Sequence, residues 1–392
     1  MSDSIVIVAA KRTPIGGMSG QLVSLTSPQL AATAIKAAVA QSGLKAADIH
    51  EAIIGCVLPA AVGQAPARQA VLGAGLLSTT ACSTLNKVCG SGMKAVMLAY
   101  DQIIAGSASV MVAGGMESMS LAPHMLPKAR QGYRYGHVKA LDHMAYDGLE
   151  NAYDGKAMGV FADATAQKYG FTREQQDAFA AESVRRAQSA VSEGRFKAEI
   201  APVTVQGKSG ETILDTDEPP GQCRPEKIPS LRPAFNKDGT VTAASSSSIS
   251  DGAAALILMK ESDAKAKGIQ PIARILGHAS NAHEPEWFTT APAGAIDKLQ
   301  NKLGWTPANV DLYEINEAFA VVTMAAMKDL GLPHDKVNVN GGACALGHPI
   351  GASGARILVT LLYALKARGG KRGIAALCIG GGEATAIAVE MV

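Results

Sequence analysis

Cys89 is the residue of this sequence best placed to do covalent chemistry. It lies in the glycine-rich segment NKVCGSG (86–92), directly before an apolar stretch that predicts a helix over 93–104. The glycines allow a sharp turn and the close approach of a ligand, and a helix start favours a thiolate, which is the nucleophilic form of cysteine. Cysteine is also among the most buried residue types, so a plain core position is the alternative.

Three more polar side chains occur in comparable segments. His348 lies in GGACALGHPIG (341–351), where an imidazole can take a proton from a cysteine near neutral pH. Cys378 precedes three glycines in LCIGGGE (377–383), which suits a second acid or base with backbone N–H groups facing an oxyanion. Asn316 follows a short apolar strand, where its amide can position a water or polarise a carbonyl. The ordinary alternatives are a structural histidine, a buried strand cysteine and a helix cap.

The chain repeats itself, and the repeat gives these segments matching positions. Segment 46–55 parallels 307–316, Ser91-Gly92 and the helix after it parallel Ser353-Gly354, and 112–115 parallels 378–381. Each half alternates helices, such as 27–42 and 294–303, with short strands, such as 109–112 and 373–377, which favours a mainly parallel sheet covered on both faces. Two such halves predict two sheets related by a pseudo-two-fold axis, with the segments of Cys89 and His348 facing each other.

Residues 121–249 interrupt this pattern. The stretch contains eight prolines and one clear amphipathic helix over 173–193, and it otherwise reads as loops and short strands. An apolar strand resumes over 251–258. We interpret 121–249 as an insertion folded over the first half, a lid or a ligand platform.

Composition bounds the class of protein. The 392 residues are 47% hydrophobic and 18% charged, which provides a large core and argues against disorder. The net charge of +2 is mixed along the chain, which argues against a nucleic-acid partner or a membrane surface. Segment 1–14 reads as a strand rather than a targeting sequence, and six sparse cysteines without a Cys-x-x-Cys pair favour neither a disulfide scaffold nor a metal site. We expect a reduced, cytoplasmic, globular protein.

At these segments the sequence resembles the thiolase family across essentially its whole length. VCGSG (88–92), NEAF (316–319), GHP (347–349) and CIGGG (378–382) are similar to the four catalytic loops of that family in order and spacing. The resemblance implies an α/β, duplicated thiolase-like fold, with two mixed, mainly parallel sheets in α-β-α-β-α layers. It also implies an N-terminal half of 1–120 plus 250–268, a CoA-binding loop domain of 121–249 and a C-terminal half of 269–392.

The resemblance further implies a role for each matched residue. Cys89 would become acylated, with His348 activating it, and Cys378 would carry protons to and from the acyl α-carbon or the CoA thiol. Asn316, through a water, and His348 would hold the enolate oxygen, and the N–H groups of Cys89 and Gly380 would form a second oxyanion hole. For the bound CoA, the resemblance implies Ser247 on the pantetheine arm, Arg224 on a phosphate, and a tunnel lined by Met158, Phe235 and Phe319.

The activity so implied is an acyl-CoA:acetyl-CoA C-acyltransferase. It condenses two acetyl-CoA to acetoacetyl-CoA and CoA, or cleaves 3-ketoacyl-CoA by thiolysis, with CoA as substrate or product and no other cofactor or metal. Members of the family form homodimers or homotetramers, and strand 81–88 is a candidate for the interface. One alternative is a decarboxylating condensing enzyme, which typically has two catalytic histidines and no counterpart of Cys378. The other is a non-catalytic acyl-CoA-binding protein, which would be expected to have lost a catalytic residue.

The sequence departs from the family around the acyl pocket. Short-chain members usually carry a histidine where this chain has Ala157, and Trp287-Phe288 replaces a more common methionine-glycine pair. Serines 245–248 and Cys344 also replace more usual residues. These departures leave the preferred acyl-chain length open.

Overall fold

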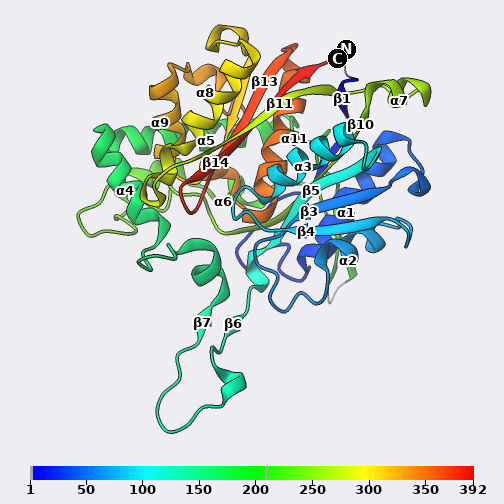
Figure 1. Cartoon of the computed structure of the whole chain (residues 1–392). Coiled ribbons are helices and arrows are strands. Elements are labelled where there is room, and N and C mark those ends of the chain that lie inside the picture. Colours follow the sequence, from blue (N-terminus) through cyan, green and yellow to red (C-terminus); the bar gives the residue numbers. More distant parts are fainter. Residues whose placement is uncertain (1–2, 208–209) are drawn as a thin grey trace.

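The computed structural model describes residues 3–207 and 210–392, and its main strands form one continuous hydrogen-bonded sheet (Figure 1). The first half has the order β4 (Ala81–Leu85), β3 (Glu51–Gly55), β5 (Val110–Ser118), β10 (Ser250–Lys260) and β1 (Ile5–Arg12), with β2 (Gly16–Gly17) paired to β10. The second half continues with β11 (Ala273–Ala282), β14 (Glu383–Met391), β13 (Arg372–Ile379) and β12 (Leu312–Ile315). Antiparallel pairing of β1 with β11, from Ile5 opposite Ile275 to Ile7 opposite Ala273, joins the two halves.

Strand direction is more mixed than the alternation of strands and helices predicted. Along the described strands, parallel pairing in the large sheet is limited to β3 with β4 and β5, and β12 with β13. The remaining pairs of that sheet are antiparallel: β10 and β14 run back along their neighbours, and β1 runs antiparallel to β11. The return of β14 on β13 is a tight hairpin through the glycines 380–382, which places a turn beside Cys378.

The helices form three layers around the two halves of the sheet, so the predicted α-β-α-β-α arrangement is confirmed. Helices α1 (Ser27–Ser42) and α2 (Pro66–Gly73) bury the outer face of the first half, and α8 (Ala291–Leu303) and α9 (Ala320–Leu330) that of the second. Between the halves lie α3 (Ser91–Ala105) and α11 (Ile350–Arg368), which pack on each other and on both sides (Figure 1). Helix α11 is long and apolar enough to cross a membrane, but 83% of that stretch is buried inside the protein.

The repeat recognised in the sequence is real, and it explains the close packing of the two central helices. Ser91-Gly92 begins α3, and Ser353-Gly354 are the fourth and fifth residues of α11, the matching helix of the second half. A β-carbon at Gly92 would lie 2.9 Å from the backbone nitrogen of Ala355, and one at Gly354 would lie 2.5 Å from that of Met93. Glycine at both positions therefore lets the helix starts of α3 and α11 touch, which brings the segments before them together.

The middle of the chain is more helical than predicted. Helix α5 (Arg173–Ser192) matches the expected one, whereas α4 (Met158–Tyr169) and a π-helix over Ala145–Leu149 were not foreseen. The remaining short elements of the chain are β6 (His124–Met125), β7 (Leu141–Asp142), β8 (Val203–Gly207), β9 (Gly210–Leu214), α6 (Glu218–Gln222), α7 (Glu261–Ala266), α10 (Ala343–Leu346) and 3-10 turns over Ala46–Asp48, Met119–Leu121, Ala129–Gln131, Pro225–Ser230, Pro285–Thr290, Pro307–Asn309 and His334–Lys336. The segment around β6 and β7 extends far from the body of the molecule (Figure 1).

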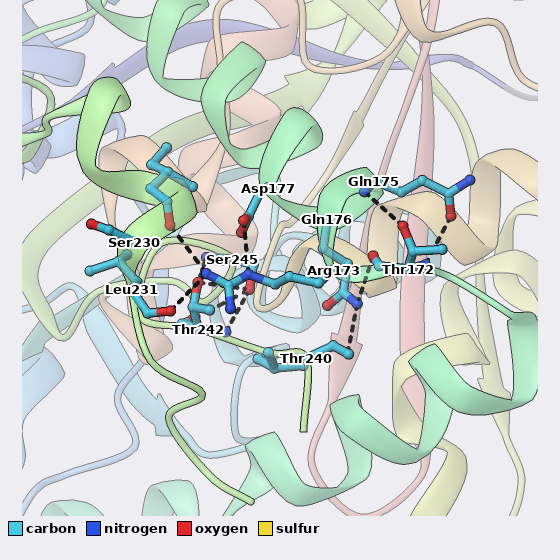
Figure 2. A network of polar contacts seen from close by, with 12 residues as sticks. Thr172, Arg173, Gln175, Gln176, Asp177, Ser230, Leu231, Thr240, Thr242 and Ser245 are labelled. Carbon is cyan, nitrogen blue, oxygen red and sulfur yellow. Dashed lines mark hydrogen bonds and ion pairs between the residues drawn. The ribbon is translucent and has the colours of Figure 1, made fainter. Parts of the chain in front are cut away.

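The start of α5 anchors the serine-rich segment of the insertion (Figure 2). The Arg173 guanidinium pairs with Asp177 at 2.8 Å and donates to the carbonyl of Leu231 at 2.8 Å. Gln176 donates from Nε2 to Thr240 Oγ1, also at 2.8 Å. These bonds hold segment 231–240 on the helix and so fix the path of the chain toward Ser247.

Candidate active site

A cavity of about 310 Å³ lies where the two halves and the insertion meet. Seven of the ten residues predicted for the site line it: Cys89, His348, Gly380, Ser247, Met158, Phe235 and Phe319. Asn316 and Cys378 lie directly behind its wall, since Asn316 approaches the His348 ring and Cys378 belongs to the apolar cluster of Met158, Phe288 and Phe319. Arg224 is the one predicted residue outside this group, and it lines a neighbouring cavity.

The turn that carries Cys89 is strained at the residue before it. Val88 has φ 46°, a left-handed conformation that a β-branched residue rarely adopts. Its N–H donates to Asn86 Oδ1 at 2.9 Å, and its carbonyl accepts from Ser91 Oγ at 2.7 Å. Ser91 Oγ also accepts the N–H of Lys87 at 2.8 Å. These side-chain bonds stabilise the strained turn and point the backbone of Cys89 toward the second half.

Burial of Cys89 outweighs the effect of the helix start. Desolvation raises the pKa of the Cys89 thiol to about 11, although the N–H groups of Gly380 and of Cys89 itself donate to the sulfur and oppose this rise. The buried carboxylate of Glu117 adds to it. The resting form is thus a thiol, and a nearby base must take its proton before the sulfur can act as a nucleophile.

His348 is arranged to be that base. Its Nδ1 lies 2.5 Å from Ser353 Oγ, and the Ser353 hydroxyl donates to the carbonyl of Pro349 at 3.0 Å. With that hydroxyl hydrogen already used, we assign the ring proton to Nδ1, which leaves Nε2 as an acceptor. Burial, together with the positive charge of Arg356, lowers the pKa of His348 to about 3, so the imidazole is neutral near pH 7.

Asn316 continues strand β12 rather than capping a helix. Its N–H donates to the carbonyl of Ala376 at 3.0 Å, and the next helix, α9, begins only after Phe319. Its Nδ2 lies 3.5 Å from His348 Nε2. The Oδ1 atom is buried and has no hydrogen-bond partner among the residues that the structure describes. The amide is thus held beside the imidazole with an acceptor free for a further polar group.

Cys378 is a buried thiol close to Cys89. It lies near the end of β13, opposite Ala384 on β14, and is fully enclosed. Burial, followed by the charge of a Cys89 thiolate, raises the pKa of Cys378 well above its ordinary value. Two nearby thiols cannot both ionise readily, which suits a pair in which one is the nucleophile and the other exchanges protons.

A second cavity of about 610 Å³ adjoins the first and shares Ser246, Ser248 and Ile249 with it. Arg224 and Lys227 lie on its wall, so its charge is locally positive. The exposed Arg224 side chain donates to the carbonyls of Gly221 and Cys223 at 3.1 Å. Ser247, at the boundary of the two cavities, donates from Oγ to the carbonyl of Ala318 at 3.0 Å.

Sequence reasoning missed two residues that build this site. Ser353 orients His348 through the contact with Nδ1. Its position, equivalent to that of Ser91 in the repeat, is the sequence signal that could have identified Ser353. Glu117 is a fully buried carboxylate in the apolar strand β5, where it accepts N–H groups from Val57, Leu58 and Gly351. Burial raises the pKa of Glu117 to about 7. A lone acidic residue in a buried strand is rare enough to be a signal by itself.

Within 3–207 and 210–392, no group of three His, Cys, Asp or Glu side chains is placed to hold a metal.

Comparison with known proteins agrees with this geometry. Residues 5–262 match the family description "Thiolase, N-terminal domain", and residues 269–391 match "Thiolase, C-terminal domain". The acetyl-CoA acetyltransferase of Chromobacterium violaceum is 50% identical over 388 residues, which cover 98% of this chain and 99% of that protein. The acetyl-CoA acetyltransferase of Allochromatium vinosum is 50% identical over 392 residues and the full length of both chains.

A solved structure extends the likeness to three dimensions. The Acat5 thiolase from Ascaris suum, crystallised in complex with coenzyme A, superposes with a TM-score of 0.94 at 42% identity. The match covers 99% of this chain and 100% of that one. On its sequence, its fold and the four loops that meet at Cys89, the chain belongs to the thiolase family.

Proposed function

We propose that this protein is an acetyl-CoA acetyltransferase that forms and cleaves the carbon–carbon bond of 3-ketoacyl-CoA through an acyl-Cys89 intermediate. The observation that supports this most strongly is the meeting of Cys89, His348 and Gly380 in one cavity, with Asn316 and Cys378 behind its wall. The relatives at 50% identity carry the same activity in their names.

In the first half-reaction, the sulfur of Cys89 attacks the carbonyl carbon of acetyl-CoA while His348 Nε2 takes the thiol proton. The N–H groups of Cys89 and Gly380, which already converge on the sulfur, would then hold the oxyanion of the tetrahedral intermediate. When this intermediate collapses, the C–S bond to CoA breaks and Cys378 gives its thiol proton to the CoA sulfur. An acetyl thioester remains on Cys89, with His348 protonated and Cys378 a thiolate.

In the second half-reaction, a second acetyl-CoA loses an α-proton to Cys378, which acts as a thiolate. Its enolate oxygen would lie between His348 and a water held by the free Oδ1 of Asn316. The enolate carbon attacks the acetyl carbonyl, the bond to the Cys89 sulfur breaks, and acetoacetyl-CoA is released. The Cys89 thiolate then takes the proton held by His348, which returns the thiol and the neutral imidazole. Thiolysis is the reverse sequence. No step needs a metal or a redox cofactor.

The two joined cavities would accommodate CoA. The apolar one, with Met158, Phe235 and Phe319, would hold the acyl group and the end of the pantetheine arm beside Ser247. The outer one, with Arg224 and Lys227, would meet the phosphates. We retain the division into 1–120 plus 250–268, 121–249 and 269–392, and a cytoplasmic location, as part of this proposal.

We also propose that the enzyme is a homodimer or homotetramer. Strand β4 is the last strand of the sheet, and its residues are exposed or half-exposed rather than core. An uncovered edge strand is a ready site for pairing with a second chain. Static light scattering should give a mass of at least twice the 40.2 kDa of one chain. A monomer at assay concentration would contradict the proposal.

Chain-length preference provides a test of the acyl pocket. Ala157 and Phe288 both line the cavity, and Phe288 packs edge-on against Phe161 and Phe319. One extra methylene in such a pocket is worth about 1–3 kcal/mol, so discrimination between neighbouring lengths should be modest. We expect thiolysis of acetoacetyl-CoA together with measurable thiolysis of six-carbon 3-ketoacyl-CoA.

The variant Ala157→His should reduce kcat/KM for the six-carbon substrate more than for acetoacetyl-CoA, because the larger side chain shortens the pocket. The measurement is thiolysis across a series of chain lengths. Ala157→Ser, which adds little bulk, is the matched control. An equal loss on both substrates would mean that residue 157 does not face the acyl chain. No thiolysis at any length by the unaltered protein would contradict the proposed function.

A further inference from the structure

Two loops from opposite halves meet beside the reactive sulfur, and an ion pair closes their outer edge. The turn 86–91 carries Cys89, and the hairpin turn between β13 and β14 carries Gly380. The ammonium of Lys87 pairs with the carboxylate of Glu383, the first residue of β14. This pair therefore links the nucleophile turn of the first half to the hairpin of the second.

Among the described residues of these two turns, the rest of the junction is close-packed, and Lys87 with Glu383 is the polar bond between their side chains. Gly90 leaves no room for a β-carbon because the Ile379 side chain fills that space. A β-carbon at Gly380 would lie 3.7 Å from Val88 Cγ1. The glycines bring the two backbones together but do not fix how far one slides along the other, since apolar contacts are non-directional. Lys87 with Glu383 adds a directional constraint to the junction.

This constraint acts on two groups whose spacing matters. The N–H groups of Cys89 and Gly380 lie two residues from Lys87 and three from Glu383, and both donate to the Cys89 sulfur. Neither Lys87 nor Glu383 lines the cavity of about 310 Å³. The two side chains are 22% and 38% exposed, so solvent reduces the strength of the pair without abolishing it.

We infer that Lys87 and Glu383 are positioning residues, whose ion pair holds the Cys89 turn against the Gly380 hairpin so that the two N–H groups converge on one oxygen. The inference rests on the proposed role of these N–H groups as an oxyanion hole. Loss of either charge would let the hairpin move. Small displacements of oxyanion-hole N–H groups lower kcat strongly.

The test uses Lys87→Met, Glu383→Gln and the charge exchange Lys87→Glu/Glu383→Lys. Each single variant should lower kcat for acetoacetyl-CoA thiolysis about fivefold, with KM for CoA changed less than about twofold. The exchanged pair should recover most of kcat, which a merely local packing role would not predict. The matched control is Lys267→Met, which removes a similarly exposed ion pair with Asp48 at 2.7 Å, remote from the site, and should leave kcat unchanged.

Alkylation of Cys89 by iodoacetamide provides a readout that does not depend on thiolase turnover. If the Gly380 N–H drifts from the sulfur, the thiolate is less stabilised, so both single variants should react several-fold more slowly at a given pH and the exchanged pair should recover. Single variants that match the unaltered protein in both assays would overturn the inference, as would an exchanged pair as slow as the singles. If the unaltered protein lacks thiolysis altogether, the proposed function fails, and the alkylation rates still decide the role of the ion pair.

Discussion

Replacement of Cys89 by alanine should lower kcat for acetoacetyl-CoA thiolysis by about 10⁴-fold, because no other group can form the acyl intermediate. The fold should survive, since the side chain is half-buried and small. Steady-state thiolysis with circular dichroism as a check of folding makes this measurement. The matched control is Cys82→Ala, another half-buried free thiol of the first half, which should retain normal turnover.

The pH dependence of the same thiol follows from its environment. Burial raises the pKa of Cys89 to about 11, so the thiolate fraction of the free enzyme should grow with each step of pH from 7 to 10. Alkylation of Cys89 by iodoacetamide should therefore accelerate throughout that range. A rate that levels off below pH 8 would mean that the free enzyme already holds a thiolate, contrary to the burial of the site.

Replacement of Cys378 by alanine should lower kcat by about 10³-fold, the scale of a lost general acid or base, while leaving acylation of Cys89 possible. The distinguishing measurement is exchange of the α-hydrogens of acetyl-CoA with deuterium in D₂O, followed by mass spectrometry. Exchange should disappear in the Cys378→Ala enzyme because the enclosed thiol is the proposed base. Undiminished exchange would assign the proton transfer to another group.

The variant His348→Ala complements Cys378→Ala, because it tests the first half-reaction, the acylation of Cys89. It removes the acceptor Nε2, so acylation of Cys89 should itself become slow. A His348→Ala enzyme that acylates as quickly as the unaltered protein would contradict the role of His348 as the base that takes the Cys89 proton. Retained acylation in Cys378→Ala and lost acylation in His348→Ala is the pattern that the geometry predicts.

The sequence predicted the family, the layers and the residues of the site because these depend on local features. Glycine-flanked segments, a repeat of nearly constant offset and apolar strands are all visible without coordinates. The thiolase resemblance is confirmed by the matches over 5–262 and 269–391. The roles of Cys89, His348, Cys378 and Asn316 remain predictions, now with a geometry that makes them testable.

What escaped the sequence depends on contacts between distant segments. Helix α4 mixes apolar, β-branched and polar residues without a clear period, and it is stabilised by packing of Phe161 and Ala162 in the cluster around Phe288. The raised pKa of Cys89 could not be predicted from the sequence for a similar reason. A helix start is visible in the sequence, whereas desolvation comes from loops of the other half and from the insertion.

The strand directions were misjudged because chain order alone does not reveal hairpins with short glycine turns. Residues 380–382 turn β13 directly into β14, so the second half ends in an antiparallel pair rather than in another crossover helix. The same turn carries Gly380, so the short glycine run after Cys378 closes the hairpin and also supplies a residue that lines the cavity.

The acyl intermediate on Cys89 is the central claim, and mass spectrometry tests it most directly. The protein is incubated with acetyl-CoA, quenched in acid and digested, and the peptides that contain Cys89 and Cys378 are compared. We predict a single acetyl adduct on the Cys89 peptide, which disappears when excess CoA is added before the quench. No adduct, or an adduct on the Cys378 peptide alone, would contradict the account.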